Sequence, residues 1–141
     1  MPGASAEARA FRYRFHAMAS EHELVLFAAE RARAERAAHA AITDVQRIEG
    51  KYTRYRDDSV TSAINRAAGG DPVAVDEETA GLIDFGAALH AQSEGRFDLT
   101  SGVLRRAWDF NSGRLPSQQQ LDAVLPLIGW SQVQWDCARV R

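Results

Sequence analysis

The sequence lacks most of the features that define specialised classes of protein. It contains one cysteine, Cys137, so an internal disulfide is impossible. Its apolar runs are far shorter than the roughly 18 residues that a transmembrane helix needs, so no membrane segment is expected. Residues 1–10 are small and polar and have no apolar signal-peptide region. We therefore expect a soluble chain without an export signal.

An excess of charge of one sign is also lacking. Lysine and arginine number 17 and aspartate and glutamate 19, which gives a net charge of −2. Such a chain has no bulk attraction for nucleic acid or anionic membranes, so neither is an expected partner. With 141 residues, 45% of them hydrophobic, the chain has the size and balance of one folded domain. We expect a flexible tail over residues 1–10 and a single domain over 11–141.

Common catalytic and metal-binding motifs are missing as well. The four histidines form neither an HExxH motif nor a Cys/His cluster, which argues against a zinc site. There is no GxSxG nucleophile motif and no phosphate-binding glycine loop. Asp57 and Asp58 could bind a metal, although two adjacent acids in a loop are more often turn formers or caps.

The first part of the chain has the pattern of a β-hairpin. Residues 11–17 alternate aromatic with basic or polar side chains, which predicts a strand with two distinct faces. Residues 22–28 form an apolar run that predicts a second, buried strand. The connection over residues 18–21 is short enough to favour an antiparallel pair.

Helices are expected to follow the hairpin. Residues 29–49 are rich in strong helix formers, and Gly50 is expected to stop that helix. Its predicted core-facing residues are Val45 and Ile48, near Ala37, Ala38 and Ala41. Ser59 is placed to cap a short helix that runs through Arg66.

Asp76 with Thr79 opens a second long helix, which extends to about Ser93. Its expected buried stripe consists of Leu82, Ile83, Phe85 and Leu89. A third helix is predicted from Ser117 to about Val124, and residues 130–135 and 138–141 have the pattern of strands. Together these elements predict an α+β fold with long helices packed on a mostly antiparallel sheet.

Two polar segments are candidates for ligand binding. In residues 52–66, tyrosines, arginines, hydroxyls and Asn65 gather around the start of one short helix, which would suit an anionic or planar ligand. The alternative is a capped helix after a polar loop, with Tyr52 and Tyr55 partly in the core. In residues 95–110, Asp98 and Thr100 lie among apolar residues in an irregular stretch of the kind that often marks a ligand site. The alternative there is that both residues are caps and the aromatic residues belong to the core.

Taken together, these segments resemble the ApbE family of FAD:protein FMN transferases, formerly called thiamine biosynthesis lipoproteins. Met18 in FHAMAS lies where the family has Met-Gly-Thr after its first strand, and residues 55–65, YRDDSVTSAIN, match the family pattern YRPDSE(L/I)SxxN. Residues 73–78, VAVDEE, precede a helix as in the family. The most specific block is SEGRFDLTSGVL at residues 93–104, followed by Trp108 and Phe110. The order of these motifs is kept from about residue 11 to residue 141.

The resemblance implies a protein that binds FAD and, with Mg²⁺, moves its FMN moiety onto a threonine or serine of a target flavoprotein, with release of AMP. Tyr55 would place its ring against the flavin or adenine, and Asp98 and Thr100 would bond the cofactor or brace its loop. The positions that match the family's FAD-contacting pattern are Met18, Tyr55, Ser62, Asn65, Phe97, Asp98, Thr100 and Trp108.

The resemblance covers only the N-terminal half of the family pattern. The family's DxGGIAKG-like segment and the Asp and Thr that hold Mg²⁺ belong to its C-terminal half, so no catalytic or metal-binding residue is assigned here. Ala19 replaces the family's glycine and so loses the freedom of glycine at positive φ and its close approach to a ligand. Val60 stands where Glu is usual, and Val103 replaces Pro.

Two hypotheses remain open at this point. The chain is either the FAD-binding portion of a flavin transferase, inactive alone, or a short flavin-binding or interaction module without transferase chemistry. The resemblance allows a periplasmic, membrane-anchored or cytoplasmic location. Because half of the family fold would leave apolar surface uncovered, a homodimer is also possible.

Overall fold

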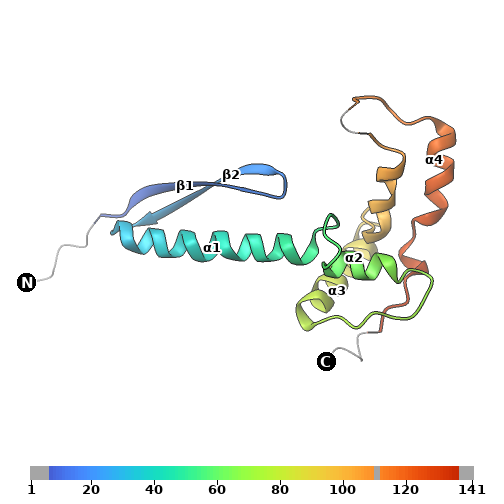
Figure 1. Cartoon of the computed structure of the whole chain (residues 1–141), viewed down its shortest axis with the longest axis horizontal. Coiled ribbons are helices and arrows are strands. Elements are labelled where there is room, and N and C mark those ends of the chain that lie inside the picture. The colour runs from blue at the N-terminus through green and yellow to red at the C-terminus, as the bar shows by residue number, and fades with distance from the viewer. Residues whose placement is uncertain (1–6, 110–111, 137–141) are drawn as a thin grey trace, which may run out of the picture. The chain divides into compact units, whose positions relative to one another are not determined.

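The computed structural model describes residues 7–109 and 112–136. The chain divides into two compact units, with the boundary between Val73 and Ala74, and each unit is described by itself. The first unit contains β1 (Arg9–Ala17), β2 (Ser20–Ala28), α1 (Arg31–Tyr52) and α2 (Val60–Arg66) (Figure 1). The second contains α3 (Glu77–Gln92), α4 (Gln118–Val124) and three 3-10 segments, η1 (Leu99–Arg106), η2 (Leu125–Leu127) and η3 (Trp130–Gln132).

The predicted hairpin is confirmed, but its second strand is not buried as expected, because Val25 and Phe27 lie on an exposed face of β2. β1 and β2 pair antiparallel, with Ala17 opposite Ser20, so the connection is only two residues long, Met18 and Ala19. Both turn residues have positive φ, 50° and 59°, which is the backbone that two-residue hairpins favour. Along β1 the aromatic residues are half-buried while Arg12, Arg14 and His16 are exposed, as the alternation predicts. The strand begins at Arg9, two residues before the expected start.

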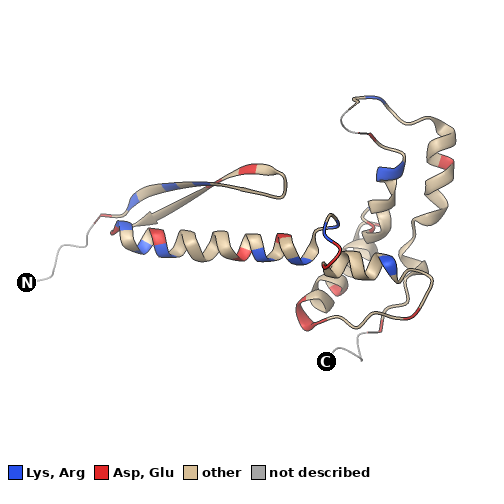
Figure 2. Ribbon diagram, in the orientation of Figure 1, with Lys and Arg blue, Asp and Glu red and all other residues tan. Residues whose placement is uncertain are grey.

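Helix α1 packs on the hairpin through small side chains. Ala34 and Ala38 are its buried residues, and Val45 and Ile48 are half-buried on the same side. In Figure 1, α1 runs alongside both strands. Figure 2 shows both signs of charge along this helix, with no block of a single sign.

Two details of the α1 prediction are wrong. Gly50 does not stop the helix, which continues to Tyr52, because a glycine within a helix costs only about 1 kcal/mol and the last turn is closed by the Thr53 N–H on the Glu49 carbonyl at 2.8 Å. Ala37 and Ala41 are exposed, since the face that meets the hairpin follows Ala34 and Ala38 instead.

Helix α2 follows α1 and contacts it. Its predicted cap is confirmed, because the Ser59 hydroxyl accepts a hydrogen bond from the Ser62 N–H at 3.0 Å. The Thr61 hydroxyl donates to the Tyr52 carbonyl at 2.8 Å, which ties α2 to the last turn of α1.

Helix α3 begins where it was expected, with the Asp76 carboxylate accepting from the Thr79 N–H at 3.0 Å. Its predicted buried stripe is wrong in part, because Phe85 is 64% and Leu82 is 50% exposed. The buried residues of α3 are instead Thr79, Ala80 and Gly86, since the helix presents its small side chains to its neighbours in this unit.

Segment η1 contacts α3, α4 and η2, and so lies between the other elements of its unit. Residues 99–106 were expected to be irregular, but they form this 3-10 helix behind an Asp98 cap. The third helix, α4, is confirmed and begins with a capping box between Ser117 and Gln120. The strand predicted for residues 130–135 is wrong, because residues 130–132 form η3, and the strand predicted for 138–141 lies outside the described residues.

Both units bury mainly small side chains. Among the described residues, those classed as buried are Ala17, Ala34, Ala38, Ala80, Gly86, Ala107, Val124, Ser59, Ser62 and Thr79. The α+β fold class, with a long helix packed on an antiparallel sheet, is confirmed. Over the described ranges 7–109 and 112–136, no helix is long and apolar enough to cross a membrane.

Candidate functional site

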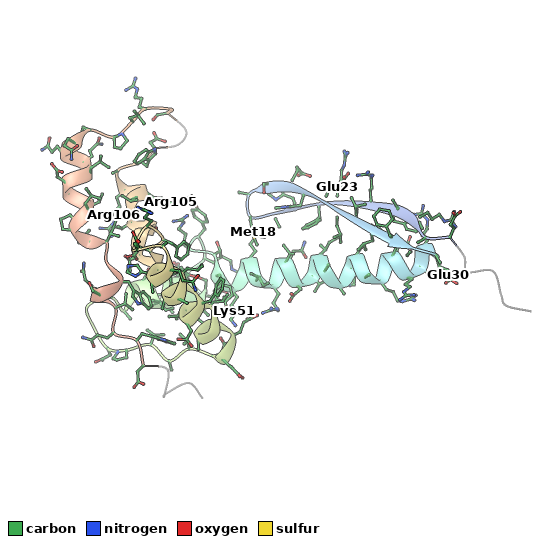
Figure 3. All side chains as sticks on the ribbon, turned by 180° about the vertical axis from the view of Figure 1, so that it is seen from behind. Met18, Glu23, Glu30, Lys51, Arg105 and Arg106 are labelled. Atoms are coloured by element: carbon green, nitrogen blue, oxygen red, sulfur yellow. The ribbon has the colours of Figure 1, made fainter. Side chains whose placement is uncertain are left out.

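In the first unit, Met18 lies at the tip of the hairpin over the C-terminal part of α1 (Figure 3). Its backbone N–H donates to the Glu49 carboxylate at 2.7 Å, a contact between residues 31 apart in the chain. This hydrogen bond fixes the turn to the helix while the Met18 side chain stays exposed. The turn is therefore held in place with an apolar side chain available for contact.

Three further candidates of the first unit lie before and along α2, and their side chains differ in what they can reach. Tyr55 is 77% exposed, and the Arg54 guanidinium lies 5.3 Å from its ring centroid. Asn65 is exposed near the C-terminal end of α2. Ser62 is buried, and its hydroxyl donates to the Arg54 carbonyl at 3.5 Å. Tyr55 and Asn65 can thus meet a ligand directly, whereas Ser62 supports the segment.

The acidic pair next to Tyr55 is engaged by arginines. Arg56 donates two hydrogen bonds to the Asp58 carboxylate, at 3.0 and 2.7 Å, and the hydrogen bond from Arg56 lowers the pKa of Asp58. Arg66 donates to the Asp57 carbonyl at 2.8 Å. The Asp58 carboxylate and the Asp57 carbonyl therefore help to fold the loop before α2, as expected of turn-forming residues.

No group of three His, Cys, Asp or Glu side chains suited to a metal ion occurs within the part of the chain that the structure describes.

In the second unit, Asp98 is the centre of a hydrogen-bonded cluster. One carboxylate oxygen, Oδ1, accepts from the Thr100 N–H at 2.7 Å and from the Thr100 hydroxyl at 2.6 Å. The other, Oδ2, accepts from the Trp130 N–H at 2.9 Å and lies 3.5 Å from His90 Nε2. The Asp98 side chain is only 8% exposed, so its hydrogen bonds are largely shielded from water.

Thr100 extends this cluster to a second segment of the chain. Its hydroxyl donates to Asp98 and accepts from the Gly129 N–H at 2.8 Å, so both roles of the hydroxyl are in use. Asp98 and Thr100 together thus hold the backbone of two successive residues, Gly129 and Trp130, against the start of η1.

The ionisation of Asp98 reflects this environment. Burial raises the pKa of the carboxyl group, but the hydrogen bonds from Thr100 and Trp130 and the nearby His90 outweigh it, so the pKa is lowered overall. The carboxylate form, which accepts all of these hydrogen bonds, is therefore the form that the folded unit favours.

The remaining two candidates lie on either side of η1. Phe97 has an exposed ring, and its N–H donates to the Ser93 hydroxyl at 2.9 Å. Trp108 is half-buried just after η1, where its N–H donates to the Leu104 carbonyl at 3.0 Å. Of the candidates in this unit, Phe97 offers the most accessible aromatic surface.

Sequence reasoning did not link His90, Gly129 or Trp130 to Asp98. Trp130 was expected in a strand, and the histidines were considered for a zinc site. Gly129 and Trp130 are 29 and 32 residues from their partners, a separation that no local spacing rule addresses. The available signal was the resemblance of residues 128–136 to the last block of the ApbE pattern, G-(W/Y)-x-x-V-x-(W/L)-D, which includes Gly129 and Trp130.

Solved structures of ApbE proteins share the fold of this chain. The ApbE protein of Thermotoga maritima matches with a TM-score of 0.81 and 27% identity, over 94% of this chain and 44% of its own. The flavin transferase ApbE of Vibrio cholerae, at 19% identity, matches in fold with a TM-score of 0.73, over 92% of this chain and 43% of its own. The fold is therefore the one found in ApbE proteins.

The ApbE family model matches residues 17–141, and the chain belongs to the ApbE family. A curated relative, the FAD:protein FMN transferase of Chlamydia pneumoniae, is 30% identical over 91 residues, which is 63% of this chain and 29% of that protein. The resemblance read from the motifs is thus confirmed. The chain spans less than half the length of these relatives, which fits the N-terminal half of the family fold.

Proposed function

We propose that this chain is the FAD-binding portion of a magnesium-dependent flavin transferase, which moves FMN from FAD onto a threonine or serine of a target flavoprotein. The observation that carries the proposal is the family match over residues 17–141, with the specific block at residues 93–104 folded into the Asp98 cluster. The relative from Chlamydia pneumoniae is named for this same transfer.

The accessible side chains fit a flavin nucleotide. Tyr55 and Phe97 present exposed aromatic rings, which can stack on an isoalloxazine or adenine ring, and the Asn65 amide can donate to or accept from its polar edge. Met18 adds an exposed apolar side chain. The flavin would supply the phosphoanhydride that reacts, and these residues would bind and orient it.

The transfer itself needs more than these residues provide. The acceptor hydroxyl oxygen forms a bond to the phosphorus of the FMN moiety, the bond to AMP breaks, and the hydroxyl proton passes to a base. Such a step needs a cation to neutralise phosphoryl charge and a base for the hydroxyl. We expect both from the half of the family fold that this chain does not span, so the chain alone should bind FAD without transferring FMN.

The alternative is a flavin-binding or interaction module without transferase chemistry. Incubation of the chain with FAD, Mg²⁺ and a threonine-containing target protein, followed by mass spectrometry for covalent FMN, tests its own capacity. Extending the chain with the missing half of a family member and repeating the assay separates the two hypotheses. Transfer only by the extended chain supports the transferase, and none by either supports the module.

The test of FAD binding is a titration of the purified chain, followed by flavin fluorescence. Tyr55→Ala should weaken FAD binding because a stacking ring is lost. Phe27→Ala is the matched control, because Phe27 is an aromatic residue of the same unit with nearly the same exposure, 74% against 77%. Equal affinity of the two variants would remove Tyr55 from the site.

The chain's expected partners are the target flavoprotein and a second copy of itself. Phe27 in the first unit and Phe85 in the second are large apolar side chains open to contact. Sedimentation analysis of the purified chain tests for a homodimer, and a monomer at all concentrations would remove it.

A further inference from the structure

Around the Asp98 cluster, some groups are free to contact a flavin, whereas others only make hydrogen bonds within the chain. Asp98 and Thr100 match the family's FAD-contacting pattern, yet both side chains make their hydrogen bonds within the chain. An isolated cap of η1 would need only the contact from Asp98 to the Thr100 N–H. The additional contacts are not needed to cap η1. They join Thr100 to Gly129, 29 residues further along the chain, and Asp98 to Trp130, 32 residues further along.

We infer that Asp98 and Thr100 are positioning residues, which hold the Gly129–Trp130 segment beside the Phe97–Thr100 loop so that the two segments form one surface for the flavin. This inference rests on the proposed function. It assigns Gly129 and Trp130, which were not among the predicted site residues, to the second unit's part of the site.

The hydrogen-bond inventory supports this role. The two oxygens of Asp98 accept hydrogen bonds from Thr100 and Trp130, and Oδ2 also lies 3.5 Å from His90 Nε2. The Thr100 hydroxyl has already used its one proton on Asp98. A flavin could compete for these groups only by displacing a contact that is charge-assisted and almost shielded from water. The side chains therefore act through the backbone that they hold, whereas the neighbouring Phe97 ring is open to the ligand.

Backbone geometry at the same place adds a second constraint. Gly129 has a φ of 158°. The N–H of the next residue, Trp130, donates a hydrogen bond to the Asp98 carboxylate. Because the Gly129 and Trp130 N–H groups bond to neighbouring side chains, both peptide units that flank the Gly129 Cα are restrained. A segment held at two successive amides is well suited to present a fixed surface.

The test uses the full 141-residue chain and compares Thr100→Val with Thr100→Ser. Valine has a similar shape but no hydroxyl, so the Gly129 amide loses its acceptor, while serine keeps the hydroxyl. In Thr100→Val, hydrogen exchange of the Gly129 amide should accelerate about tenfold or more and the Kd for FAD should rise about tenfold, as expected when a partly buried hydrogen bond is lost. Thr100→Ser should restore both values.

Asp84→Asn is the matched control. Asp84 accepts from the Trp135 indole N–H at 2.7 Å, so it also secures the later part of this unit, but it does not touch Gly129 or Trp130. This variant should leave the Gly129 exchange rate and the FAD affinity unchanged.

Native exchange at Gly129 in Thr100→Val would overturn the inference, as would faster exchange combined with unchanged FAD affinity. Equal losses in Thr100→Ser and Thr100→Val would also overturn it, because the hydroxyl would then be irrelevant. If the native chain binds no FAD, the proposed function fails and so does the flavin part of the inference. The exchange rates would still show whether Thr100 holds the segment, so the two failures are distinguishable.

Discussion

The side chain of Leu99 lies directly over the backbone of Gly86, so closely that a Cβ at residue 86 would be 2.7 Å from Leu99 Cγ. Gly86 is a buried residue of α3, and Leu99 is the first residue of η1. The absence of a side chain at residue 86 thus allows η1 to approach α3 and sets the position of the Asp98 cap, one residue before Leu99.

Gly86→Ala should therefore destabilise the chain by about 1–3 kcal/mol, because either Leu99 or the whole of η1 must move to make room. Gly81→Ala is the matched control in the same helix, since a Cβ there meets nothing within 4 Å. It should stabilise the chain by up to about 1 kcal/mol through helix propensity alone. Chemical denaturation of both variants checks this, and a stabilising Gly86→Ala would contradict the described packing.

In the hairpin turn, by contrast, we expect a substitution to stabilise the chain. Ala19 has φ of 59°, in the left-handed region that disfavours a Cβ. Ala19→Gly should stabilise the chain by about 0.5–1 kcal/mol, the relief of strain minus the added entropy of the unfolded chain. Ala40→Gly, at an exposed position of α1, should cost about 1 kcal/mol. Thermal unfolding would refute the turn geometry if both glycines lowered the midpoint.

Tyr13 carries a polar group that its surroundings do not satisfy. Its hydroxyl is buried and has no hydrogen-bond partner among the residues that the structure describes. Tyr13→Phe removes that group and keeps the ring, so it should be neutral or stabilise the chain by about 1 kcal/mol. Tyr55→Phe, at an exposed ring, should change little. A loss of more than 1 kcal/mol in urea denaturation of Tyr13→Phe would reveal a hidden partner of the hydroxyl.

Asp98 should make the stability of the chain sensitive to acid. Because its pKa is lowered in the folded state, its contribution is fully present above the unfolded value of about 3.9 and is lost as the pH falls toward the folded value. The denaturation midpoint should therefore fall below about pH 4 more steeply in the native chain than in Asp98→Asn. Asp122→Asn, at an exposed position of α4, should follow the native profile. Parallel profiles of the native chain and Asp98→Asn would contradict the lowered pKa.

Local signals predicted the elements that local chemistry determines. The caps at Ser59, Asp76 and Ser117 each depend on a side chain and an amide two or three residues away, and all three are confirmed. The hairpin was also predicted correctly, because the alternation of side chains along β1 and the short connection to β2 are local features of the sequence. Where one residue's neighbours in the chain decide its structure, the sequence was sufficient.

Predictions failed where distant contacts decide the structure. The exposure of Leu82 and Phe85 depends on which face of α3 meets η1, and the fit of Leu99 over Gly86 decides that. The segment at 130–135 has strand-like composition, but the Trp130 amide bonds to Asp98 instead of to a neighbouring strand. The site was predicted as a set of residues, whereas the cluster that links Asp98, Thr100 and Gly129 became visible only in the fold.

The central claim is that this chain carries the FAD-binding portion of a flavin transferase, and equilibrium titration of the purified chain with FAD tests it most directly. We expect saturable binding of one FAD per chain with a change in flavin fluorescence, weakened by Tyr55→Ala and unaffected by Phe27→Ala. Fluorescence that shows no saturable change at any FAD concentration, confirmed by calorimetry on a folded sample, would contradict the claim.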